Sequence, residues 1–152
     1  MSLSRVVLLV TLGCGVMGCE IADLDGTPSS PSPPPAASTI AVENFTASST
    51  PAGSGVSTYR IAFMLRETTG VAATLSDVTL TALTGLGGIS RSFTAMQAFG
   101  TNRIAAGGTV SASVTLEGPS SSASQLRVRV PFTDDRGNTG TAEGLTTVTT
   151  GS

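Results

Sequence analysis

Apolar and polar residues alternate with a period of two along much of the chain beyond residue 39. Two segments show the pattern most clearly, STYRIAFMLRE at residues 57–67 and SQLRVRVPFTDD at residues 124–135. Their alternating apolar residues are Tyr59, Ile61, Phe63 and Leu65 in the first, and Leu126, Val128, Val130 and Phe132 in the second. Because successive side chains of a β-strand point to opposite faces, this pattern predicts two strands with one buried face each.

Further segments with the same period are separated by glycine, serine, proline and asparagine, which are turn residues. These segments lie at residues 39–47, 75–83, 90–97, 109–117 and 139–150. Together with the first two they give about seven short strands and no amphipathic helix. The sequence therefore predicts a single all-β domain over residues 39–152.

This spacing of strands and turns resembles that of the immunoglobulin-like β-sandwich, in which two antiparallel sheets pack face to face. The resemblance covers residues 39–152 and implies a sandwich of about seven strands. The chain has no tryptophan and only two cysteines, Cys14 and Cys19, both far from this region. The core Trp and inter-sheet disulfide of antibody domains are therefore missing, so we expect a disulfide-free variant.

The first eighteen residues have the composition of a secretory signal peptide. One arginine, Arg5, precedes the run VVLLVTLGCGVMG at residues 6–18, which is too short to span a bilayer comfortably. The run ends in Val16-Met17-Gly18-Cys19, which resembles the lipobox of bacterial lipoproteins at Val16, Gly18 and Cys19; Met17 departs from the usual smaller residue.

The lipoprotein resemblance implies that a signal peptidase recognises Val16 and Gly18 and that lipid is attached to the Cys19 thiol, which then becomes the N-terminus. The protein would be held at the bacterial cell envelope by membrane lipid. A lipobox ending at Cys14 is a poorer match, because Thr11 would take the aliphatic position. In the alternative, an ordinary signal peptidase releases a secreted, unlipidated adhesion or accessory module.

Residues 19–38 are predicted to be a disordered linker. The segment TPSSPSPPPAAST at residues 27–39 is rich in proline and serine, which cannot form a packed core and favour extended polyproline-like chain. Such a linker would separate the domain at residues 39–152 from a membrane.

The residue inventory narrows the possible functions. Histidine is absent, all eight basic residues are arginines, and the net charge is -2. Without histidine, the commonest acid–base group and metal ligand, we expect neither an enzyme nor a cofactor-binding protein. Without an excess of positive charge, we expect no nucleic-acid partner. A binding or structural role with an envelope protein or another ligand remains the expectation.

The most polar cluster of the domain is TDDRGNTG at residues 133–140. Asp134, Asp135, Asn138 and Glu143 could offer oxygen ligands to calcium, although the spacing fits no EF-hand loop. Asp, Gly and Asn are also the residues that tight turns select, so a turn between the last two strands is favoured. The neighbours Asp134 and Asp135 should point to opposite faces of a strand.

Other charged residues are interpreted as solvated. Glu67, Arg66 and Asp77 are expected to be exposed at strand ends. Arg127 and Arg129 are expected to form an outward-facing row.

Two local features remain open. Pro131 has no N–H to donate to a sheet, which predicts an edge position or a bulge. Residues 84–102 are the least strand-like segment and contain Phe93, Met96 and Phe99, so they form either a binding loop or a central strand with an irregular start.

Overall fold

The computed structural model describes residues 36–84, 87–119 and 123–151. The description below concerns the compact unit Pro35–Ser152. The predicted signal peptide and nearly all of the predicted linker lie outside the described residues.

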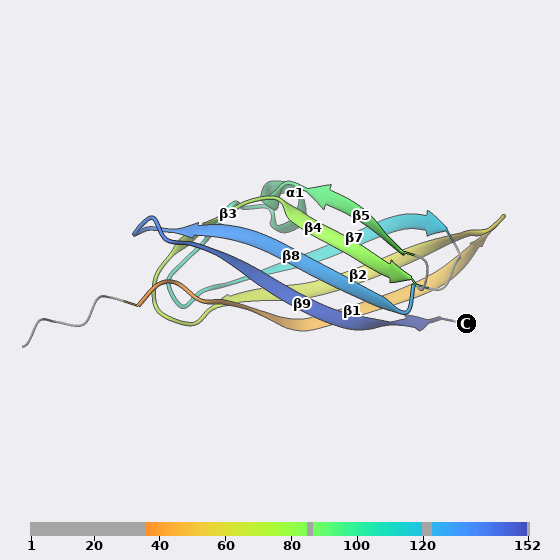
Figure 1. Ribbon diagram of the computed structural model, residues 1–152, viewed down its shortest axis with the longest axis horizontal. Helices are drawn as coiled ribbons and strands as arrows, with labels where there is room; N and C mark the ends of the chain where they lie inside the picture. Colours follow the sequence, from red (N-terminus) through yellow and green to blue (C-terminus); the bar gives the residue numbers. More distant parts are fainter. Residues whose placement is uncertain (1–35, 85–86, 120–122, 152) are drawn as a thin grey trace, which may run out of the picture. The chain divides into compact units, whose positions relative to one another are not determined.

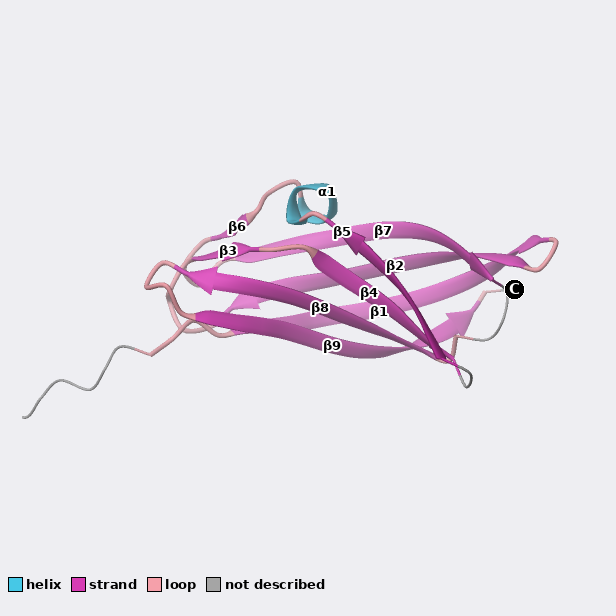
Figure 2. Ribbon diagram, turned by 45° about the horizontal axis from the view of Figure 1, so that its top comes forward, coloured by secondary structure: helices cyan, strands magenta, loops and turns pink. Residues whose placement is uncertain are grey.

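The described domain is all-β, as the sequence predicted, with nine strands and one short helix (Figures 1 and 2). The elements are β1 (Ile40–Gly53), β2 (Val56–Glu67), β3 (Ala73–Leu75), β4 (Val78–Thr84), β5 (Gly87–Phe93), α1 (Ala95–Phe99), β6 (Arg103–Ile104), β7 (Thr109–Pro119), β8 (Gln125–Asp134) and β9 (Thr139–Thr150).

The main strands form one continuous, curled sheet in the order β5-β4-β8-β9-β1-β2-β7. Neighbours pair antiparallel, except that β9 and β1 run parallel over the short register Ala47 to Ser49 opposite Val148 to Thr150. The short strands β3 and β6 extend the sheet beside β8. The outer strands of the main order, β5 and β7, are not paired with each other in the described structure (Figure 2).

The alternating apolar residues predicted to be inward all lie in the core. Tyr59, Ile61, Phe63 and Leu65 of β2 and Leu126, Val128, Val130 and Phe132 of β8 are buried. Two edge-to-face ring contacts, Phe45 with Phe63 and Phe63 with Phe99, cross the middle of this core at centroid distances of 5.8 and 5.6 Å. The period-two pattern thus assigned the buried face of both strands correctly.

The single strand predicted at residues 75–83 is instead two strands, and Pro131 supplies the reason. Along β8, Leu75 of β3 is opposite Phe132, whereas Thr79 of β4 is opposite Arg129. Between them the Ser76 amide donates to the Pro131 carbonyl at 2.9 Å. The Pro131 nitrogen, which carries no hydrogen, therefore faces the break between β3 and β4. The expectation of an edge strand was wrong, because β8 is interior and pairs with strands on both sides.

The strand predicted at residues 90–97 is also wrong in its second half, where α1 begins. Thr94 is the N-cap: its hydroxyl accepts from the Gln97 amide, and the Gln97 side chain accepts from the Thr94 amide. This capping box has the spacing Thr-x-x-Gln, and Gly100, with φ of 73°, ends the helix. These capping residues are visible in the sequence. The helix is shorter than two turns, however, so its apolar residues do not show a helical period.

Gly144 sits where β9 crosses β1. A Cβ at this position would lie 2.7 Å from Val42 Cγ1 and 3.1 Å from Phe45 Cδ1. Because valine has little rotamer freedom to yield, only glycine fits between the strands without displacement.

We expect Gly144→Ala to lower the free energy of unfolding by about 1–3 kcal/mol, because the added methyl group overpacks the contact with Val42 and Phe45. Urea denaturation checks this. Gly151→Ala is the matched control, because its Cβ would be 3.5 Å from the nearest atom, Thr50 Oγ1. Equal stability of the two variants would contradict the packing argument.

Candidate functional site

The residues predicted for lipid attachment and cleavage, Cys19, Val16 and Gly18, lie outside the described residues. What the structure does describe is the point where the chain enters the domain. There Ser38 meets two buried carboxylates, Glu67 at the end of β2 and Asp134 at the end of β8. We call Ser38, Glu67 and Asp134 the junction cluster.

Glu67 is only 1% exposed, yet its carboxylate accepts several hydrogen bonds. Oε1 accepts from the Thr69 amide at 2.7 Å and the Thr69 hydroxyl at 2.5 Å. Oε2 accepts from the amides of Gly70 at 2.8 Å and Gly107 at 2.7 Å. The carboxylate therefore joins the turn after β2 to the turn before β7. The expectation that Glu67 is a solvated strand-end charge was wrong.

Asp134 is 4% exposed and organises the turn between β8 and β9. Its Oδ1 accepts from the amides of Arg136 at 2.9 Å and Asn138 at 2.8 Å, and its Oδ2 accepts from Asn138 Nδ2 at 3.0 Å. The backbone closes the same turn, because Asp134 N donates to Asn138 O and Gly137 N donates to Asp134 O. Residues 134–138 thus form the tight turn that the sequence favoured.

Ser38 bridges the two carboxylates. Its amide donates to Asp134 Oδ2 at 3.0 Å, and its hydroxyl makes a longer contact of 3.4 Å with Glu67 Oε1. On either side, Arg136 Nη1 donates to the Ala36 carbonyl at 2.7 Å, and the Thr68 amide donates to the Thr39 carbonyl at 3.0 Å. The chain is therefore fastened to two distant strand ends just before β1 begins.

The hydrogen bonds of the junction cluster stabilise the ionised carboxylates. Burial is the largest influence on Glu67 and raises its pKa, but the Thr69 hydroxyl, the Gly107 amide and amides of the turn after β2 together lower the pKa to about 2. For Asp134, the Asn138 side chain and the Ser38 amide are the main causes that lower its pKa to about 2.

The residues considered as calcium ligands are not gathered at one point. Asp135 lies in the turn after β8, not on the strand, and forms an ion pair with Arg103 at 2.5 Å. Glu143 pairs with Arg129 at 2.7 Å across β9 and β8. In the described part of the chain no group of three or more Asp, Glu, Cys or His residues could hold a metal ion.

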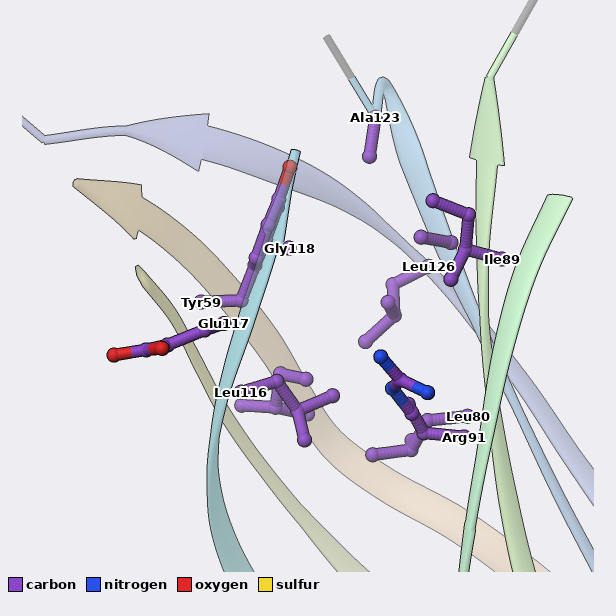
Figure 3. Close-up of a pocket in the computed structure, with 11 residues that line it drawn as sticks. Tyr59, Leu80, Ile89, Arg91, Leu116, Glu117, Gly118, Ala123 and Leu126 are labelled. Atoms are coloured by element: carbon purple, nitrogen blue, oxygen red, sulfur yellow. The ribbon is translucent and has the colours of Figure 1, made fainter. Parts of the chain in front are cut away.

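A small apolar cavity of about 40 Å³ lies between β2 and β7 on one side and β4, β5 and β8 on the other (Figure 3). Tyr59 and Leu116 face Leu126, Ile89 and Arg91 across it. Pockets for small molecules typically measure roughly 300–1,000 Å³, so this cavity is too small to hold such a ligand whole.

The remaining candidate segments have structural roles. Phe93 and Phe99 pack against the core, whereas Met96 is 57% exposed on α1. Arg127 and Arg129 are exposed on β8, which is an interior strand, so they do not protect an edge. The described part of residues 84–102 thus holds the edge strand β5 and the helix α1, whose Ala95 and Ala98 are buried, so the expectation of a central strand was wrong.

Comparisons with known proteins identify a shared fold only. No protein-family model matches the chain, and no curated protein sequence matches it. The structural-genomics target SoR45 superposes with a TM-score of 0.56 and 10% identity over 72% of this chain and 86% of its own.

Two other solved structures are less similar. The putative ApaA protein from Bordetella pertussis gives a TM-score of 0.47 at 15% identity, over 74% of this chain and 94% of its own. The alkylpurine DNA glycosylase AlkC of Pseudomonas fluorescens, bound to DNA containing an abasic-site analogue, gives a TM-score of 0.35 at 13% identity. The match covers 72% of this chain and 30% of the glycosylase.

Within the described residues, no helix is long and apolar enough to cross a membrane.

We expect the stability of the domain to fall as the pH is lowered from about 5 to about 2. In the unfolded chain the two carboxyls take up protons near their ordinary pKa values, 4.5 for Glu67 and 3.8 for Asp134, whereas in the folded domain they do so near 2. The unfolded state therefore binds more protons in this range, and acid favours it. Thermal unfolding followed by circular dichroism measures the effect; a melting temperature constant over this range would contradict it.

We expect Glu67→Gln to lower the free energy of unfolding by about 3 kcal/mol at neutral pH. The glutamine NH₂ group would replace Oε1 or Oε2, and because it cannot accept hydrogen bonds, the donors to that oxygen would lose their partner. The variant should also lose part of the pH dependence between about 5 and 2. Urea unfolding at two pH values tests both expectations. Glu43→Gln, which alters a carboxylate outside the cluster, is the control and should behave like the wild type.

Proposed function

We propose that this chain is an exported bacterial envelope lipoprotein, acylated at Cys19, in which residues 19–38 form a linker and the β-domain is a non-catalytic module for binding or structural interaction. Val16 and Gly18 would be read by the signal peptidase. The principal partner is membrane lipid, through the acylated cysteine, and the second is an envelope protein or ligand bound by the domain.

The observation that carries this proposal is the order of features along the chain. An apolar run ending in Val-Met-Gly-Cys is followed by a Pro/Ser-rich stretch, and β1 begins at Ile40, directly after it. The junction cluster lies at this boundary. A domain held by a linker needs its first ordered residues fixed, and hydrogen bonds from Ser38 and Arg136 meet that requirement.

The cysteine inventory supports the same assignment. Both cysteines, Cys14 and Cys19, precede the described domain, so its fold contains no thiol or disulfide. Cys19 therefore has no cysteine of the described domain to pair with, and Cys14 would be removed with the signal peptide. Acyl chains contribute about 0.8 kcal/mol per buried methylene, so two or three chains would hold the protein at a membrane.

We further infer that the curled sheet is a variant of the immunoglobulin-like sandwich. In support, the strands fall into two groups, β1-β2-β7 and β5-β4-β8-β9, and among the described residues the groups pair only through the short parallel register between β1 and β9. The inward faces of both groups contribute to one core. The non-catalytic role is supported by the lack of histidine and by the engagement of both buried carboxylates with hydrogen-bond donors.

We expect Cys19→Ala to move the full chain, expressed in a Gram-negative host, from the membrane fraction to the soluble fraction. The reason is that only a thiol at this position accepts lipid. Fractionation with immunodetection measures the distribution, and Cys14→Ala, which changes a residue within the predicted signal peptide, is the matched control and should stay with the membranes.

Mass spectrometry of the N-terminal peptide distinguishes the two export hypotheses. The lipoprotein hypothesis requires a peptide beginning at Cys19 with the added mass of acyl chains. An unmodified N-terminus near this position would overturn it in favour of the secreted, unlipidated adhesion or accessory module.

A further inference from the structure

The strand β7 is a long and regular sheet edge. It pairs with β2 from Thr109 to Pro119 without a register shift, and it ends the strand order of the main sheet. Natural edges are usually protected by lysines, prolines, bulges or shortness. β7 has none of these before Pro119, and Glu117 is its one charged residue.

The direction of its backbone groups follows from one hydrogen bond. The Glu67 amide donates to the Gly108 carbonyl at 3.0 Å, so the backbone groups of Gly108 face β2. Because these groups alternate along a strand, those of residues 109, 111, 113, 115 and 117 face away from β2, toward the free edge. Pro119 continues this series and, having no N–H, marks where a further strand could no longer pair fully.

The side chains of the same residues form a row on the solvent face. Thr109, Ser111, Ser113, Thr115 and Glu117 are all exposed. α1 also contacts β7, and its Phe99 packs on the buried Phe63 of β2, while all five side chains of the row stay exposed.

We propose that β7 is a homodimer interface: two copies of the chain pair antiparallel through β7, with Ser113 on the two-fold axis. This inference rests on the edge itself and is independent of the lipoprotein proposal. The sequence of β7 is self-complementary about Ser113, because Ser111 meets Thr115 of the second copy and Thr109 meets its Glu117. Hydroxyl pairs of this kind are favourable cross-strand neighbours.

The backbone fits the same register. All five residues that face the free edge form hydrogen-bonded pairs with their counterparts, which gives about ten N–H···O bonds between the copies. On the inner face Val110 meets Leu116 and Ala112 meets Val114. Apolar side chains therefore pair on one face and hydroxyls on the other.

Charge complementarity favours a second copy of the chain as the partner of β7. Arg66 lies beside Thr109 on β2, and Glu117 of the second copy would lie on the other side of Thr109. Arg66 and that glutamate are then two strand spacings, about 10 Å, apart across a short threonine, a distance their long side chains span together. The two-fold axis makes this pair twice, and among the described residues neither Arg66 nor Glu117 has an ion pair within its own chain.

Oxidative crosslinking of Ser113→Cys in the full chain, in whole cells that express it, tests the geometry. The two introduced thiols would face each other across the axis, so we expect a disulfide-linked dimer on non-reducing gels. Thr46→Cys, on β1 and therefore two strands away from the edge, is the matched control and should remain monomeric, as should the wild type. Crosslinking of Ser113→Cys no greater than that of Thr46→Cys would overturn the proposal.

Charge reversal gives a second test that leaves the edge backbone intact. We expect Glu117→Arg to weaken dimerisation of the detergent-solubilised full chain roughly tenfold in sedimentation velocity, because two exposed ion pairs are lost. The double variant Glu117→Arg/Arg66→Glu restores both pairs with reversed polarity and should regain wild-type association. A wild-type chain that sediments as a monomer, or a double variant no better than the single one, would overturn the proposal.

Discussion

The pairing of β9 with both β8 and β1 is the constraint on which the rest of the fold depends. β9 runs antiparallel to β8 from Thr139 to Thr147 and then parallel to β1 from Val148 to Thr150. In the part of the chain that the structure describes, it is this strand that joins the two groups of strands into one curled sheet. Gly144 allows the crossing, because a side chain there would meet Val42 and Phe45, and the curl encloses the apolar faces of β2 and β8 in a single core.

Two buried carboxylates give the domain a polar attachment at the end where the chain enters. A buried charge is costly unless hydrogen bonds compensate it, and both Glu67 and Asp134 receive bonds from backbone amides as well as side chains. Since Ser38 contacts both, the beginning of the domain is tied to the ends of β2 and β8. The same arrangement would suit the tethered module proposed above, and we expect it to make the domain sensitive to acid.

The two edge strands of the main sheet, β5 and β7, differ in how well they could pair with a further strand. β5 is a short strand of seven residues, and the small apolar cavity separates it from β7 at the level of Tyr59 and Ile89. β7 is longer, regular and nearly uncharged, with hydroxyl side chains outside. An edge of this kind is expected to find a strand partner unless something blocks it.

The sequence by itself determined the all-β class, the buried faces of β2 and β8, the β8–β9 turn and the absence of cysteine from the domain, because these follow from local periodicity, local turn chemistry or composition. It also contained the Thr94 capping box, which a helix of five residues made easy to overlook. Only the tertiary structure decided that Glu67 is buried, that Pro131 faces a gap between β3 and β4, and that β7 is an edge. Each of these depends on contacts between residues far apart in the chain, such as Ser38 with Asp134, which no local pattern encodes.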